Sequence, residues 1–482
     1  MSDTKNADGG GGARRYGCVL FDDVDNPKLG WAAVNGNESY VVNGLHDLAN
    51  DVTWLTNLNY DQFKTSKASV NPSLRSEAYL PMPIKEMLAE WGLDPANTSL
   101  AVTAKFCSSL FQRIMGIAWK LVREANPDAD RLRTFVGSSL REDLRGLIPR
   151  MDAPEEEAWH LFEGNQAVQD FTATTLKSVR GAKQFKFRRP RLAHAFDLFT
   201  APVPSGEFKM FSRSDMRGTG DRVSWVRSEE RPCMVNATVL GLSNGAASAD
   251  VSDVFAFGNS INKERRVRTW MPHPEFMVLS TFARVDVLGA WVGETYRPMN
   301  LSMPQAVKDF LSNRYVEMSW SAGVVAECLL RAALMPAPPE RGAKYDKNAP
   351  QKPRTTWQGA WLRSVDRMSM FTNAMEMYRD GFVVQSYGLG WVKCAATDDQ
   401  VPDLMNKAMS LGMVPTFWEI PDALFKPGSI PWSADKRSVA LAGMTASKQK
   451  NMLWNLDRLP MYERERQEEM LRQIAGQGAR KE

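Results

Sequence analysis

The stretch YGCVLFDDVDNPKLGWAAV, residues 16–34, is the segment on which a fold assignment for this chain depends. It contains an apolar run that ends in Asp22 and Asp23, then a turn sequence, then a second apolar run. Two such runs separated by Asp, Asn and Pro predict a β-hairpin, because these residues favour turns. The run SYVVNG at 39–44 extends the prediction to a three-stranded meander.

This opening also resembles a known family. Nucleases of the ribonuclease H type begin with a central strand that ends in an Mg²⁺-binding aspartate, and a hairpin carries the chain onward. The segment VLFDDVDNPKLGWAAV resembles that start, which implies Asp23 as a metal ligand, Mg²⁺ as cofactor and a fold of that type. Metal-assisted cleavage needs several carboxylates around the scissile phosphate. Partners would have to come from later segments, and the sequence offers Asp398, Asp399, Glu275 and Asp286.

A plain turn explains the same residues. Alternation along a strand places Asp22 and Asp23 on opposite faces, so at most one can join a given ligand set. Asp25 stands where such nucleases often have a small residue, and Asp25 with Asn26 precedes Pro27, a typical turn sequence. We therefore predict that these aspartates form a turn and hold no metal.

A basic window is the second informative feature. From Phe171 to Phe196 the sequence has seven Lys and Arg residues and no Asp or Glu. A polyanion gives clustered cations a shared ligand, and aromatic side chains among them can stack on unpaired bases. A second basic segment, NKERRVRTW, occupies 262–270. The predicted nucleic-acid-binding residues are Lys183, Lys186, Arg188, Arg189, Arg191, Lys263, Arg265, Arg266 and Arg268, with Phe185, Phe187 and Trp270 as stacking partners. We predict that Arg188, Arg189 and Arg191 share one exposed face with Arg265 and Arg266.

Composition excludes several classes. The chain has 482 residues, a net charge of +4, and no apolar run of the length that a membrane span requires. Its five cysteines are scattered without a CxxC pair, and its four histidines lack metal-ligand spacing, so neither a disulfide framework nor a zinc centre is expected. No GxxxxGK[ST] motif is present. The amino terminus lacks a secretory h-region, and we expect a location in the cytoplasm or nucleus of a host cell, or in a virion.

The periodicity of apolar residues predicts an α+β fold: a predominantly helical two-lobed body with a small N-terminal β-meander and a basic middle section rich in strands and loops. Helices are expected at 82–92, 102–125, 130–148, 155–180, from 304 to about 334, and at 357–381, and a hairpin at 382–396. The predicted divisions are an arm at 1–15, a meander with a helical lobe at 16–180, the basic section at 181–300, a mostly helical lobe at 301–432 with an exposed loop at 335–356, and a charged helical tail at 433–482.

The leading functional hypothesis is a non-enzymatic viral coat or nucleocapsid-type protein. It would bind single-stranded nucleic acid, with RNA favoured, and self-associate in many copies without a cofactor. The alternative is the Mg²⁺-dependent nuclease, or another nucleic-acid-processing protein of a phage or mobile element, with Asp23 at its centre. A protein–protein scaffold is the third hypothesis.

Overall fold

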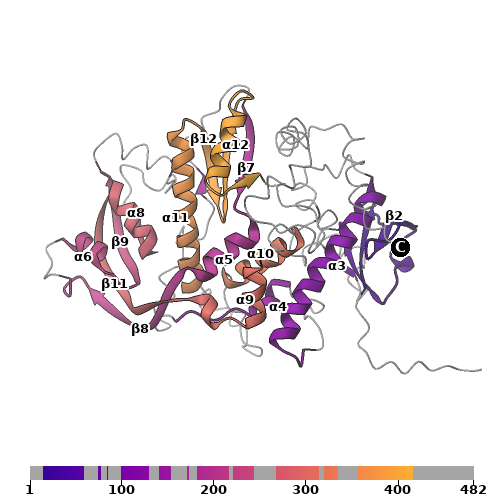
Figure 1. Cartoon of the computed structure of the whole chain (residues 1–482), viewed down its shortest axis with the longest axis horizontal. Coiled ribbons are helices and arrows are strands. Elements are labelled where there is room, and N and C mark those ends of the chain that lie inside the picture. The colour runs from indigo at the N-terminus through magenta and orange to yellow at the C-terminus, as the bar shows by residue number, and fades with distance from the viewer. Residues whose placement is uncertain are drawn as a thin grey trace, which may run out of the picture.

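The structure is a computed structural model of the chain. It describes residues 15–58, 74–76, 84, 99–129, 140–152, 171–172, 182–216, 221–243, 254, 267–313, 320–334 and 356–415. Within these ranges the chain forms nine α-helices and three mostly antiparallel sheets, so the mixed α+β character is confirmed (Figure 1). The sheets have five, four and five strands, which is more sheet than the predicted, predominantly helical body contains.

The N-terminal sheet is built around the opening hairpin. Its strands are β1 (Arg15–Phe21), β2 (Gly30–Val34), β3 (Tyr40–Val42), β4 (Val52–Thr56) and β5 (Leu74–Ser76), in the spatial order β3-β2-β1-β4-β5. The predicted meander is present, with β2 antiparallel to β1 and β3. Two further strands, β4 and β5, join parallel to β1. The central strand β1 is therefore buried on both faces.

One face of this sheet is covered by the long helix α3 (Leu100–Ala125), which contacts β1 and β2. The sequence predicts this helix because its apolar residues recur at helical spacing. Phe106, Leu110, Ile114 and Leu121 are buried against the sheet and the neighbouring helices. In Figure 1 this helix leads from the N-terminal sheet toward the middle of the molecule.

The middle of the molecule is a helical layer around α10 (Trp320–Leu334). Most of its residues are apolar, and 13 of its 15 residues are buried, as expected for a helix surrounded by others. It contacts α3 and three further helices, α4 (Leu140–Arg145), α5 (Arg191–Thr200) and α11 (Trp357–Arg379). The short helix α9 (Gln305–Ser312), which follows the 3-10 turn η9 (Met299–Ser302), packs against α3 and α5.

A four-stranded antiparallel sheet forms the end opposite the N-terminal sheet (Figure 1). Its order is β10-β9-β11-β8, with bounds β8 (Pro202–Ser212), β9 (Cys233–Leu242), β10 (Val267–Pro272) and β11 (Ala283–Pro298). Helices α6 (Arg222–Ser228) and α8 (His273–Phe282) connect and cover its strands. Within positions 181–300, the described residues thus form long strands together with helices.

The third sheet combines distant segments. Its order is β14-β7-β13-β12-β6, with bounds β6 (Phe171–Thr172), β7 (Lys183–Arg188), β12 (Val383–Gly388), β13 (Trp391–Ala396) and β14 (Val414–Pro415). The predicted hairpin β12–β13 is confirmed, and β7 pairs with β13 antiparallel. Helix α12 (Val401–Ser410) follows the hairpin. Helix α11 contacts β10 and α8 as well as β12 and β13, so it lies between this sheet and the four-stranded one.

Several predictions are wrong. A helix at 155–180 was expected, but residues 171–172 form strand β6. Helices α5, α6 and α8 lie in the section that was predicted to contain strands and loops. In α5 the buried residues Leu192, Ala195 and Leu198 follow helical spacing, which the basic residues around them obscured. The predictions for the arm, for 82–92 apart from Ile84, for the loop at 335–355 and for the tail fall outside the described residues.

Candidate nucleic-acid interface

Strand β7 divides the basic window between two faces of its sheet. Phe185 and Phe187 are 1% and 0% exposed and belong to the hydrophobic core that the two C-terminal sheets share. Because side chains alternate along a strand, Gln184 and Lys186 point to the opposite face, where both are exposed. The prediction that Phe185 and Phe187 stack on bases is therefore wrong.

Strand β13 adds an aromatic and a cationic side chain to the outer face. Lys393 lies directly opposite Lys186 in the register of the two strands, and Trp391 lies opposite Arg188. The Lys186 ammonium is 4.7 Å from the centre of the Trp391 ring, a cation–π contact. The side chain of Lys393 makes no hydrogen bond or ion pair with any residue that the structure describes. We call the outer surface formed by Gln184, Lys186, Trp391 and Lys393 the open face.

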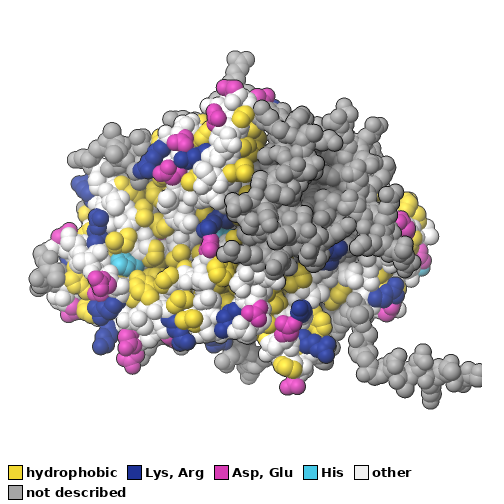
Figure 2. Space-filling model, viewed as in Figure 1, with side chains coloured by type: hydrophobic (Ala, Val, Ile, Leu, Met, Phe, Trp, Pro, Cys, Tyr) yellow, Lys and Arg dark blue, Asp and Glu magenta, His cyan; other side chains and the backbone are white. Residues whose placement is uncertain are grey.

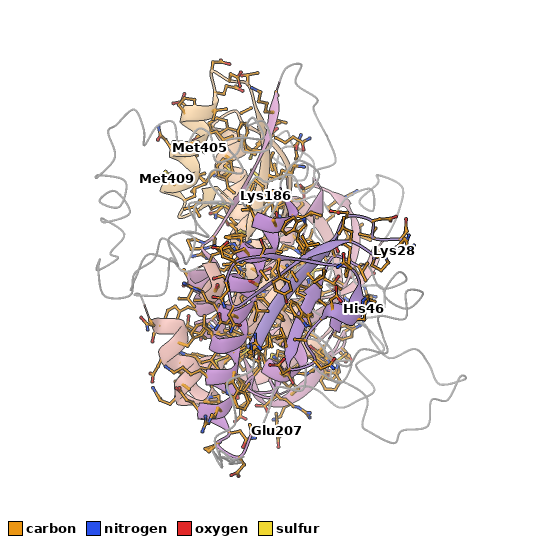
Figure 3. All side chains as sticks on the ribbon, turned by 90° about the vertical axis from the view of Figure 1, so that its right-hand side faces the viewer. Lys28, His46, Lys186, Glu207, Met405 and Met409 are labelled. Atoms are coloured by element: carbon orange, nitrogen blue, oxygen red, sulfur yellow. The ribbon has the colours of Figure 1, made fainter. Side chains whose placement is uncertain are left out.

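Like charges opposite each other in a sheet repel and cost stability. Lys186 and Lys393 are such a pair, and an anion bound between them would relieve the repulsion. Figure 3 labels Lys186 on β7, away from Lys28 and His46 of the N-terminal sheet and its connections. The open face is therefore a separate feature of the third sheet.

The arginines at the end of β7 and the start of α5 have structural partners instead. Arg191 Nε lies 2.6 Å and Arg188 Nη2 3.2 Å from Glu327 Oε2. Arg331, one turn further along α10, contacts the other oxygen at 2.5–2.8 Å. Burial alone would raise the pKa of Glu327, but the charges of the three guanidinium groups outweigh it and hold the pKa well below its usual range. This carboxylate is therefore ionised and tethers β7 and α5 to α10.

The predicted single exposed arginine face is therefore wrong for two of its members. Arg188 and Arg191 have side chains that are 11% and 0% exposed, so they cannot lie along a strand of nucleic acid as predicted. Arg189 pairs with Asp197, and Lys183 with Asp398 at 2.7 Å. Trp270 is 5% exposed and packs in the core, so it is not a stacking surface. Of the second basic segment, Lys263, Arg265 and Arg266 lie outside the described residues, and Arg268 is placed only by its strand pairing with β9.

The turn that precedes Trp391 is held by hydrogen bonds to a buried pair of side chains, His194 and Asp366. His194 Nε2 lies 2.6 Å from Asp366 Oδ1, and the amide of Gly390 donates to both oxygens of Asp366 at 3.1–3.2 Å. The Gly390 carbonyl in turn accepts a hydrogen bond from the Arg189 amide at 2.8 Å. Helices α5 and α11 thereby hold the start of β13 in place, which fixes the position of Trp391.

The opening aspartates behave as turn residues. Asp23 Oδ1 accepts hydrogen bonds from the amides of Asp25 and Asn26 at 2.9 and 3.2 Å, and Asp22 donates its amide to the Leu29 carbonyl at 3.1 Å. All three aspartates are exposed beyond the end of β1. The central strand and hairpin implied by the ribonuclease H resemblance are present. The predicted partners Asp398 and Asp399 follow β13 of a different sheet.

The other candidate metal ligands are engaged elsewhere. Glu275 lies in α8 and contacts Arg367 at 2.5 Å, and Asp286 on β11 pairs with Arg213. Among the residues that the structure describes, no group of three or more His, Cys, Asp or Glu side chains is placed to hold a metal ion. The same residues include no helix that is long and apolar enough to cross a membrane.

Sequence reasoning found Lys186 but missed Trp391, Lys393, Glu327 and Asp366. Their roles depend on pairings between distant segments: Glu327 contacts Arg191 across 136 positions of sequence, and Asp366 contacts His194 across 172. One available signal was the tryptophan and the lysine at alternate positions of the predicted hairpin, which place both on one face.

No protein-family model matches the chain, and no curated protein matches it. Solved structures of Phi29 DNA polymerase do match over most of its length. Its orthorhombic crystal form aligns with a TM-score of 0.43 at 10% identity, covering 81% of this chain and 82% of that one. Its complex with primer-template DNA gives a TM-score of 0.45 at 10% identity, and its complex with single-stranded DNA 0.40 at 10%, each covering 81% of both chains. Identities this low and TM-scores below 0.5 carry no conclusion about function.

Proposed function

We propose that this chain binds single-stranded nucleic acid through the open face of its third sheet. The observation that carries the proposal is the Lys186–Lys393 pair beside Trp391, on a sheet surface whose opposite side is fully packed. Two cations opposite each other suit a phosphate, and the neighbouring indole ring offers a surface for a base. The hydrogen bonds of Gly390 to Asp366 and from Arg189 keep that ring in a fixed position.

An unpaired strand is the form of nucleic acid that this surface fits. In a duplex the bases are stacked inside the helix, so an aromatic side chain on the surface of a sheet can contact only the sugar–phosphate backbone. In a single strand the bases can turn outward and stack on an aromatic ring, at about 1–3 kcal/mol per base. Neither phosphate contact nor stacking reads base identity, and the binding should tolerate any sequence.

The test is binding of a labelled single-stranded oligonucleotide by fluorescence anisotropy. We expect Trp391→Leu to weaken binding about five- to hundredfold, the equivalent of one lost stacked base. The matched control is Trp31→Leu, which removes a partly buried indole from β2 of the N-terminal sheet. If both variants bind as the parent does, the open face is not the interface.

The coat-protein form of the hypothesis is not kept. Nothing in the described part of the chain points to assembly in many copies or to a preference for RNA. Figure 2 shows Lys and Arg side chains interspersed with Asp and Glu on the face in view, not gathered into one basic groove. The proposal is therefore limited to the binding of single-stranded nucleic acid.

Nucleic-acid processing is the second candidate function, and one observation favours it. The N-terminal sheet places β1 between an antiparallel hairpin and parallel strands, as the ribonuclease H resemblance implies. The assay is incubation with labelled single-stranded and duplex substrates in Mg²⁺ or Mn²⁺, beside Asp23→Ala and, as a control from the same turn, Asp25→Ala. Cleavage that is lost only in Asp23→Ala would establish this candidate. Absence of cleavage by the parent, with strand binding intact, would remove it.

A further inference from the structure

A second cationic surface lies at one end of the four-stranded sheet. It consists of Arg213, just after β8, and Arg222, at the start of α6, which both contact Asp286 of β11, together with Arg284 on the same strand as Asp286. We call these four side chains the arginine patch. It lies on a different sheet from the open face, and it uses none of the residues to which the binding role was assigned above.

Within the patch, two guanidinium groups contact one carboxylate, that of Asp286. Arg213 Nη2 lies 2.8 Å from both carboxylate oxygens of Asp286, and Arg222 Nη2 lies 3.4 Å from one of them. Arg284 lies two residues before Asp286 on the same strand, the pairing with β9 is irregular between Arg284 and Val285, and the Arg284 guanidinium lies beside Gly241 of β9. The other face at this point carries Val287, which is 1% exposed and belongs to the core.

The patch has more positive than negative charge. Arg213 and Arg222 contact the Asp286 carboxylate, and within the described residues neither they nor Arg284 contact another acidic side chain. The side chains of Arg213 and Arg222 are 51% and 29% exposed, and Arg284 is exposed. The charge is therefore open to a ligand from solvent.

We infer that the arginine patch is a second contact for the backbone phosphates of nucleic acid, and that Asp286 is an internal counter-anion that competes with phosphate. This inference rests on the proposed function, because it assumes that a strand already bound at the open face reaches the patch. Arginine forks match phosphate oxygens closely. Two contacts on one chain raise the local concentration of strand at each, so long strands gain affinity that short ones do not.

Asp286→Asn tests the inference because it should strengthen binding, whereas loss of structure can only weaken it. Asparagine keeps the shape of the side chain but removes the competing charge. We expect a strand of about 30 nucleotides to bind several-fold more tightly, and the slope of log affinity against log salt to steepen by about 0.7 for each added phosphate contact. The gain should shrink as the strand is shortened to a length that occupies only one of the two surfaces.

Arg284→Ala should have the opposite effect, a several-fold loss for the long strand and a shallower salt slope. The matched control is Arg297→Ala, an exposed arginine on the same strand β11 that is not part of the patch. The inference is overturned if Asp286→Asn fails to tighten binding, if Arg284→Ala and Arg297→Ala behave alike, or if polyglutamate competes at the patch as well as the oligonucleotide does.

The two proposals fail separately in this design. If Trp391→Leu weakens binding while both patch variants match the parent, the open face stands and the patch does not. If the patch variants shift binding and Trp391→Leu has no effect, the patch is the interface and the proposed function of the open face is wrong. Melting temperatures of all variants show that binding is measured on folded protein.

Discussion

Glu327 shows how single residues decide the meaning of a charge run. Read along the sequence, the arginines after β7 look like a ligand surface. In the fold, one buried carboxylate on α10 gathers Arg188, Arg191 and Arg331. Charge composition could not reveal this, because the acid that pairs with Arg191 lies 136 positions away. Of the two lysines that face each other on the third sheet, Lys186 and Lys393, only Lys186 was identified from sequence.

We predict that Glu327→Gln destabilises the protein by about 3–5 kcal/mol, because it leaves buried guanidinium groups without their counter-charge. Urea unfolding followed by circular dichroism measures the change. Glu38→Gln is the control, since Glu38 pairs with Lys105 but is 86% exposed, and such surface pairs contribute about 1 kcal/mol or less. Equal effects of the two substitutions would contradict a structural role for the Glu327 cluster.

His273 gives the fold a dependence on pH. Burial lowers its pKa below 6.5, and the hydrogen bond to the Val226 carbonyl and the charge of Glu229 only partly oppose this. The unfolded chain therefore takes up a proton more readily than the fold does, and stability falls as the pH drops below about 6.5. We expect the melting temperature to decline less steeply between about pH 7 and pH 5 in His273→Gln than in the parent. Parallel curves for the two proteins would contradict this.

At the scale of elements, the sequence predicted what depends on local pattern. The opening hairpin, helix α3, helix α11 and the hairpin β12–β13 all follow from apolar spacing and turn residues. The pairing of β7 with β13 did not, because it joins segments about 200 residues apart and leaves no local signal. The open face depends on that pairing, which explains why half of it was missed.

The turn before β13 offers a matched pair of glycines. Gly390 and Gly412 both have φ of +70°, so an alanine is strained equally at either position. A Cβ at Gly390 would also lie 2.6 Å from the His194 ring, whereas nothing lies within 4 Å at Gly412. We expect Gly390→Ala to cost about 1–3 kcal/mol more than Gly412→Ala in chemical denaturation, and to weaken strand binding through Trp391. Equal losses of unfolding free energy in the two variants would show that the turn at Gly390 can shift away from His194 without loss of stability.

At the scale of the whole molecule, the structure places two cationic surfaces on two sheets that share one core. With about four to six phosphate contacts in total, affinity should fall on the order of a hundredfold between about 50 and 200 mM salt. Anisotropy titrations at several salt concentrations measure this slope. A flat response would remove the electrostatic basis of both proposals.

Helix α11 has a consequence for how the protein opens. Trp357 and Trp361 near its start belong to the N-terminal core, whereas Met370 and Met377 further along belong to the core of the two C-terminal sheets. A helix that completes both cores cannot detach from one without exposing the other. The amide hydrogens of α11 should therefore exchange with deuterium only when both of these hydrophobic cores unfold together. Cleavage of the chain at any point within α11 should leave neither fragment able to hold its native form.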